Sequence, residues 1–165
     1  MKDINFKISN ILYAFAIGIA SPYIILRTNE IAQNYFSIVI GLSVLAAAIG
    51  AYISGFHLKP RKITLSLNRA IEVVILILFA YAGNLMQILV LNCLIGATSG
   101  AGESLASSRV AEQDSQFTKN FAMYSITITT GIGISMILSG LVKDYVFQIA
   151  AILVLVSVYF VYEKR

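Results

Sequence analysis

The chain alternates long apolar stretches with short polar ones. Six apolar stretches have close to the roughly 20 residues that a helix needs to cross about 30 Å of hydrocarbon. They cover residues 8–26, 35–56, 63–82, 85–107, 120–141 and 145–162. None shows the alternating ten-residue pattern that is typical of membrane β-barrels. The pattern predicts an all-α membrane protein, with six transmembrane helices in a single domain over residues 1–165.

The composition agrees with this interpretation and excludes several functional classes. Hydrophobic residues make up 58% of the 165 positions and charged residues 12%, where soluble domains have about a quarter charged. A single cysteine and a single histidine exclude a disulfide framework and leave too few ligands for a zinc or haem site. We therefore expect neither metal nor cofactor. The connectors are too short to form a domain outside the membrane.

The positions of the basic residues predict the orientation of the helices. Ten of the 12 fall on one side of the predicted spans and two on the other. The first group is Lys2, Lys7, Lys59, Arg61, Lys62, Arg69, Arg109, Lys119, Lys164 and Arg165, and the second is Arg27 and Lys143. Because cytoplasmic loops carry the excess of basic residues, both termini are predicted to lie in the cytoplasm, with the chain in the cell membrane. We attribute the net charge of +4 to this topology and not to nucleic-acid binding.

The first stretch permits a second interpretation, a signal peptide that is cleaved near residue 20. The apolar run continues past that point to Leu26, which a signal peptide does not need. This continuation favours a retained first helix.

Small residues concentrate in the stretches 35–56, 85–107 and 120–141, among them Gly96, Gly100 and Gly131. Helices in lipid associate through close packing, which small residues permit. These glycines therefore mark either ordinary packing within one subunit or an interface between two subunits.

Ionisable side chains within a span are costly, and each is a functional candidate. Glu103 is the best candidate for a proton-binding or substrate-binding group, and the alternative is a glutamate that reaches the cytoplasmic boundary or pairs with a basic loop residue. Glu72 follows Arg69 by three residues and shares its helical face. The spacing predicts a structural ion pair between them.

Uncharged polar residues supply further candidates for a binding cavity. They are Tyr13, Ser21, Asn92, Tyr124 and Thr127. The alternative for serine and threonine is a hydroxyl that bonds back to its own helix. No basic residue lies deep in 8–26 or 85–107, which argues against highly anionic solutes. Because no serine has an identifiable base, we do not expect an enzyme.

Several segments resemble parts of the major facilitator superfamily of transporters. Gly18 to Leu26, with Pro22, is similar to the end of that family's first helix, and Gly96 to Arg109 is similar to its fourth. The segment Phe121 to Tyr124, with the glycines that follow it, resembles the fifth helix.

The connector that begins at Gly55 resembles the family's signature loop, with Arg61 and Lys62 as its closing basic pair. Lys59 stands near the place of an expected aspartate, and the loop is shorter than the family's. The resemblance implies a gating role for Gly55, Lys59, Arg61, Lys62 and Arg109.

The resemblance implies half of a secondary transporter for a small solute, with proton coupling as one option. Such a half cannot enclose the central cavity, which forms between two six-helix bundles. A parallel homodimer, or pairing with another half-bundle, would provide the second one.

Two other functions fit the same sequence. One is a non-transporting membrane partner or immunity-type protein that binds another membrane protein. The other is a substrate-capturing subunit of a larger uptake complex. A transporter needs solute flux from the chain itself, a partner protein needs a different chain that co-purifies, and a capture subunit needs an energising ATPase.

Overall fold

A computed structural model describes residues 4–59, 61–112 and 117–162 of the chain. It is all-helical, and no strand occurs among these residues, which confirms the predicted all-α class. The α-helices are α1 (Ile4–Ala32), α2 (Phe36–His57), α3 (Lys62–Tyr81), α4 (Leu85–Glu112), α5 (Phe117–Leu138) and α6 (Val146–Tyr162). Two short 3-10 segments, η1 (Gln33–Tyr35) and η2 (Ser139–Tyr145), connect α1 to α2 and α5 to α6.

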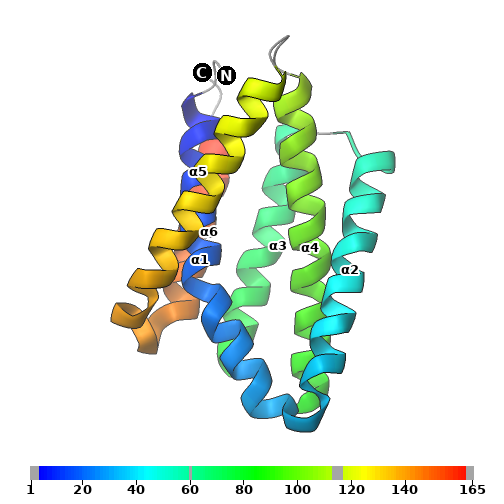
Figure 1. The fold of residues 1–165 in the computed structure, drawn as a ribbon, viewed down its shortest axis with the longest axis vertical. Helices are drawn as coiled ribbons and strands as arrows, with labels where there is room; N and C mark the ends of the chain where they lie inside the picture. Colours follow the sequence, from blue (N-terminus) through cyan, green and yellow to red (C-terminus); the bar gives the residue numbers. More distant parts are fainter. Residues whose placement is uncertain (1–3, 60, 113–116, 163–165) are drawn as a thin grey trace.

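The helices run up and down along one axis and form a bundle (Figure 1). The main packing pairs are α2 with α4, α1 with α5, α1 with α6, α3 with α4, and α3 with α6. These pairs show an internal symmetry between the first three helices and the last three. If α1, α2 and α3 are exchanged with α4, α5 and α6, the pair α2 with α4 becomes α1 with α5, and α1 with α6 becomes α3 with α4. The pair α3 with α6 stays the same. Because α1 and α4 run in opposite directions (Figure 1), the two three-helix units are related as an inverted repeat. Inverted repeats of this kind build many secondary transporters.

Glycines bring α2 and α4 to backbone contact. A Cβ at Gly96 or Gly100 would collide with the backbone carbonyl of Ser43 or Ala47, and one at Gly50 would collide with that of Ala97. The Ser43 hydroxyl also donates to the Asn92 carbonyl oxygen at 2.8 Å. The small faces of these two helices are therefore filled by each other, within one chain.

The equivalent pair, α1 and α5, is built in the same way. A Cβ at Gly18 would collide with Ser135 and with the backbone of Ile132, and one at Gly131 would come within 3.0 Å of the Ala14 Cβ. Packing within one subunit is thus what the structure shows for Gly96, Gly100 and Gly131. Gly41, Gly133 and Gly140 instead have open space around them among the described residues.

Helix α1 runs six residues past the end of its predicted apolar stretch at Leu26, up to Ala32. Arg27 supports this extension, because it lies 3.7 Å from Glu30 one turn later and donates to the Ala82 carbonyl oxygen at 2.7 Å. The chain then reverses at Gln33, whose φ of 44° is the one positive value at a non-glycine residue in the described part. The helix ends where the backbone turns, and not where the apolar run ends.

Within the described part of the chain, three helical stretches are long and apolar enough to cross a membrane: Ile4–His57, which contains both α1 and α2, then Lys62–Tyr81 and Leu85–Ala111. Ser125–Leu141 and Val146–Val161 are shorter apolar helices. Large apolar side chains also point away from the bundle, among them Leu45, Ile49 and Phe56 of α2. These features support association of the chain with a membrane.

Candidate functional site

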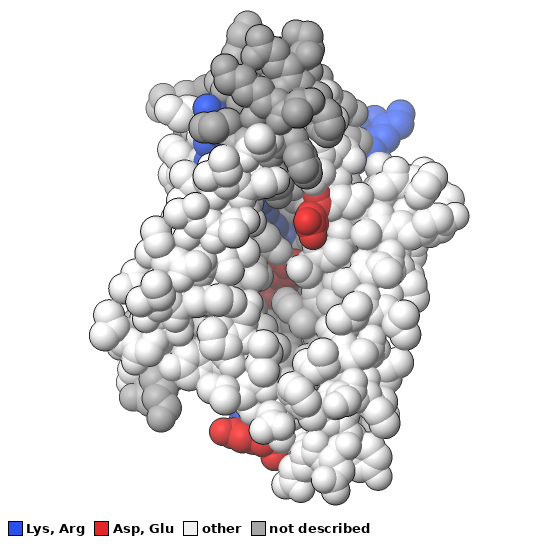
Figure 2. All heavy atoms as spheres, in the orientation of Figure 1, with Lys and Arg blue, Asp and Glu red and all other residues white. Residues whose placement is uncertain are grey.

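A cavity of about 310 Å³ lies between α1, α3, α4 and α5. Half of its lining residues are polar, in contrast to the outer surface of the bundle. The polar residues that line it are Tyr13, Arg69, Ser99, Glu103, Ser107, Ser125 and Thr129. Figure 2 shows a hollow in the front face of the bundle, with acidic and basic atoms inside it, whereas the other charged atoms in this view lie toward the two ends of the molecule. A groove of about 380 Å³ between α3 and α4 has Gln87 as its amide-bearing residue among mainly apolar ones, and it offers little chemistry.

Arg69 of α3 reaches this cavity from a buried position, with 2% of its surface exposed. Its guanidinium donates to the Ser9 and Asn10 side chains of α1, at 2.6 Å for the Asn10 Oδ1, and to the Ser157 hydroxyl of α6 at 3.4 Å. It also lies 4.6 Å from the centre of the Tyr13 ring, within range of a cation–π interaction. Arg69 therefore joins α1, α3 and α6 beside the cavity.

Glu72 lies one turn further along α3 and is fully buried. Its Oε1 accepts a hydrogen bond from the Tyr13 hydroxyl at 3.0 Å, whereas its Oε2 has no hydrogen-bond partner in the described part of the chain. Tyr13 thus contacts Glu72 through its hydroxyl and Arg69 through its ring. The structure brings the predicted pair into one buried cluster with Tyr13 as the common neighbour.

Glu103 is exposed and stands on the wall of the cavity that α4 contributes. Ser99 and Ser107 lie four residues before and after it, so the three side chains follow one face of the helix. Tyr13 and Glu103, which the sequence singled out separately, therefore border the same space.

The remaining candidates lie elsewhere. Asn92 is buried and its amide donates to the Thr28 hydroxyl at 2.9 Å and to the Ile88 carbonyl oxygen, so it ties α4 to α1. The Ser21 hydroxyl bonds back to the carbonyl oxygen of Ile17 at 2.6 Å, as the alternative for serine anticipated. Thr127 is half-buried on α5 and is not among the lining residues. The side chain of Tyr124 lies outside the described residues.

The residues of the predicted gating loop separate into four places. Lys59 and Arg61 are exposed in the connector between α2 and α3, Lys62 begins α3, and Gly55 lies in the last turn of α2. Arg109 is buried within α4, and its guanidinium lies 4.9 Å from the centre of the Phe6 ring. Arg109 therefore belongs to the bundle interior and not to the connector.

Arg69 is a cavity residue that the sequence pattern did not indicate. Its basic side chain was expected at the cytoplasmic boundary, whereas the structure buries it two turns into α3. Its polar partners come from α1 and α6, which are distant in sequence, so no local pattern indicates them. Anionic solutes were not expected because no basic residue lies deep in the stretches 8–26 and 85–107. Helix α3 supplies the basic group that these two stretches lack.

Comparisons of the chain with family models, with curated proteins and with solved structures give no match. The resemblance to the major facilitator superfamily therefore stays an expectation from the residues quoted for it. The cavity and the buried cluster beside it carry the functional argument.

Proposed function

We propose that the chain is a six-span half-bundle of a secondary transporter in the cell membrane, with both termini in the cytoplasm, and that its cavity binds a small polar solute. The observation that carries this proposal is a polar cavity inside a bundle whose outer faces are apolar. Polar and ionisable groups at such a position are costly in a membrane, and they mark substrate or ion pathways. The volume of about 310 Å³ is at the lower end for small-molecule sites.

The lining indicates the kind of solute. Glu103 offers a carboxylate, and Ser99, Ser107 and Ser125 offer hydroxyls that both donate and accept hydrogen bonds. Arg69 adds positive charge on the α3 side. This lining suits a small solute with several hydrogen-bonding groups and, where it is charged, groups of both signs.

The arrangement of helices supports movement around the cavity. The cavity lies where α1 and α5 meet α3 and α4, and the two close pairs, α1 with α5 and α2 with α4, stand on either side of it (Figure 1). Rigid units that rock about a central site are the general mechanism of secondary transporters. A second half-bundle, either another copy or a different chain, would close the open side of the cavity.

The test is solute binding followed by flux. Purified chain in lipid vesicles is screened by thermal unfolding against a panel of small amino acids, sugars and carboxylic acids. A ligand at about 100 times its Kd stabilises the folded state by about 2.7 kcal/mol, which shifts the melting temperature measurably. Uptake of the labelled hit into the vesicles then measures transport.

Glu103→Gln is the site variant and Glu30→Gln its matched control, because Glu30 is an exposed glutamate at the far end of α1. We expect Glu103→Gln to bind about tenfold more weakly, which corresponds to a loss of about 1.4 kcal/mol, and Glu30→Gln to bind as the wild type does. Absence of flux both from the wild-type chain alone and from the chain together with any membrane protein that co-purifies with it would contradict the proposal. Co-purification of a different membrane protein would then favour the partner function, and a requirement for an ATPase would favour the capture subunit.

A further inference from the structure

We infer that Glu72, and not Glu103, is the proton-binding group of the chain, and that protons reach it from the cavity through the hydroxyl of Tyr13. This inference deepens the proposed transport function and rests on it. The starting observation is the fully buried Glu72 carboxyl, with one oxygen bonded to Tyr13 and the other without a hydrogen-bond partner in the described part of the chain. A buried group with an unused oxygen requires an explanation, and an added proton provides one.

Tyr13 connects this carboxyl to the cavity. Tyr13 is one of the lining residues, and its hydroxyl oxygen lies 3.9 Å from the position that a Cβ would take at Gly102, another lining residue. The hydroxyl end of Tyr13 therefore borders the space of the cavity. On its other side the same hydroxyl donates to Glu72 Oε1 at 3.0 Å, so one hydroxyl group separates the cavity from the carboxyl.

A two-proton relay satisfies this geometry. A hydronium ion in the cavity gives a proton to the Tyr13 oxygen and becomes water, while the original hydroxyl proton of Tyr13 passes to Glu72 Oε1. One O–H bond of Tyr13 breaks as another forms, so Tyr13 stays a neutral phenol and Glu72 becomes a neutral carboxylic acid. The reverse exchange returns the proton to the cavity.

The groups around Glu72 determine what this proton does. Tyr13 faces it from α1, the neutral Thr98 lies near it on α4, and Arg69 lies one turn before it on α3. The neutral Ser157 of α6 belongs to the same cluster. Glu103 of α4 is the other carboxylate at the cavity. When Glu72 binds a proton, the sum of the charges on Arg69 and Glu72 changes from zero to +1. Because Arg69 lines the cavity, proton binding and the binding of an anionic group of the solute then favour each other.

The experiment detects the proton directly, without a solute. Infrared difference spectra of the full chain in lipid are recorded from mildly acidic to mildly alkaline pH, and the C=O stretching band of a protonated carboxyl is followed. We expect a titrating band in the wild type that Glu72→Gln removes and that the matched variant Glu103→Gln keeps. In Tyr13→Phe the band should remain at a changed frequency, because its hydrogen bond is lost.

Glu72→Asp provides a second variant in case Glu72→Gln does not fold. It retains a carboxyl group, so the frequency of the band must shift if the band belongs to residue 72. An unchanged band in Glu72→Gln or Glu72→Asp, or its loss in Glu103→Gln, would overturn the inference. The infrared experiment and the flux assay test different claims, so one can fail without the other. A band that depends on Glu72 in a chain without solute flux contradicts the transport function alone, whereas flux without such a band contradicts the proton site alone.

Discussion

At the scale of single residues, Arg69 joins more of the structure than its sequence position indicates. Its guanidinium holds side chains of α1 and α6 and lies over the ring of Tyr13. Removing it would leave Ser9 and Asn10 buried without their donor and Glu72 without its basic neighbour. A buried carboxylate that loses its compensating charge destabilises a protein strongly.

We predict that Arg69→Ala lowers the free energy of unfolding by about 3 kcal/mol. Arg61→Ala, at an exposed position of the connector before α3, should change it by less than about 0.5 kcal/mol. Thermal unfolding of both variants in the same detergent measures the difference. Equal melting temperatures for the two variants would show that the buried contacts of Arg69 contribute nothing to stability.

Asn92 supports a second prediction, because it ties α4 to α1 at a distance from the cavity. Its amide donates to Thr28 and its backbone oxygen accepts from Ser43 of α2. We predict that Asn92→Ala destabilises the bundle by about 1 kcal/mol and leaves the affinity for any solute found in the binding screen unchanged. A drop in affinity at constant stability would return Asn92 to the list of site residues.

The sequence could indicate polar candidates but not which of them meet. Tyr13 and Glu103 were expected, and both border the cavity. Ser21 and Asn92 have the same residue chemistry, yet one bonds to its own helix and the other packs between helices. The difference depends on the rotation of each helix, and α1 and α4 are too uniformly apolar for their sequence periodicity to fix it.

At the scale of elements, close helix pairs determine the shape of the bundle. Gly50, Gly96 and Gly100 let α2 and α4 touch through their backbones, and Gly18 and Gly131 do the same for α1 and α5. The clustering of small residues predicted close packing, and the structure shows which helices are paired. The sequence alone did not indicate these pairings, because a small residue fits equally well against any neighbour.

We therefore predict that Gly100→Ala destabilises the bundle, because its Cβ would overlap the carbonyl of Ala47 and push α2 away. The cost should be about 1–3 kcal/mol. Gly133→Ala is the matched control on α5, since a Cβ there meets open space and alanine favours the helix. Comparison of the two unfolding midpoints decides the matter, and a neutral Gly100→Ala would mean that α2 and α4 do not pack this closely.

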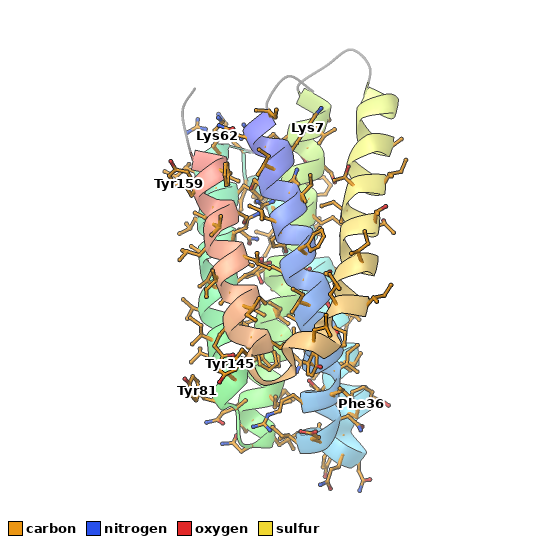
Figure 3. All side chains as sticks on the ribbon, turned by 90° about the vertical axis from the view of Figure 1, so that its left-hand side faces the viewer. Lys7, Phe36, Lys62, Tyr81, Tyr145 and Tyr159 are labelled. Carbon is orange, nitrogen blue, oxygen red and sulfur yellow. The ribbon has the colours of Figure 1, made fainter. Side chains whose placement is uncertain are left out.

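At the scale of the whole molecule, the ends of the bundle differ in charge. Lys7 and Lys62 lie at one end, and Phe36 and Tyr81 at the other (Figure 3). Removing the buried Arg69 and Arg109 from the ten basic residues of the first group leaves eight, against two in the second group. The asymmetry still favours a cytoplasmic location for the end that carries Lys7 and Lys62.

Topology is tested by single cysteines in a chain whose native Cys93 is replaced by serine. Cysteine in place of the exposed Lys59 should react with a membrane-impermeant reagent only from the cytoplasmic side. Cysteine in place of the exposed Asn29, in the last turn of α1, should react only from outside. Labelling of both positions from the same side would contradict the six-span arrangement.

The last prediction concerns the expected second bundle. The cavity is open on one face (Figure 2), and the proposed transport function requires that this face be closed. The small faces of α2 and α4 are filled within the chain, so they do not argue for a dimer, and the open cavity is the remaining reason to expect one. If two copies face each other across their cavities, cysteine at the exposed Thr129 on the cavity rim should cross-link between copies with a bifunctional thiol reagent. Cysteine at the exposed Ile152 of α6, which does not line the cavity, should not cross-link.

The comparison is made in native membranes with Cys93 replaced. Cross-linking through Ile152 alone, or a monomer that transports by itself, would contradict the facing dimer, whereas attachment of Thr129 to a different chain would identify a separate half-bundle as the partner.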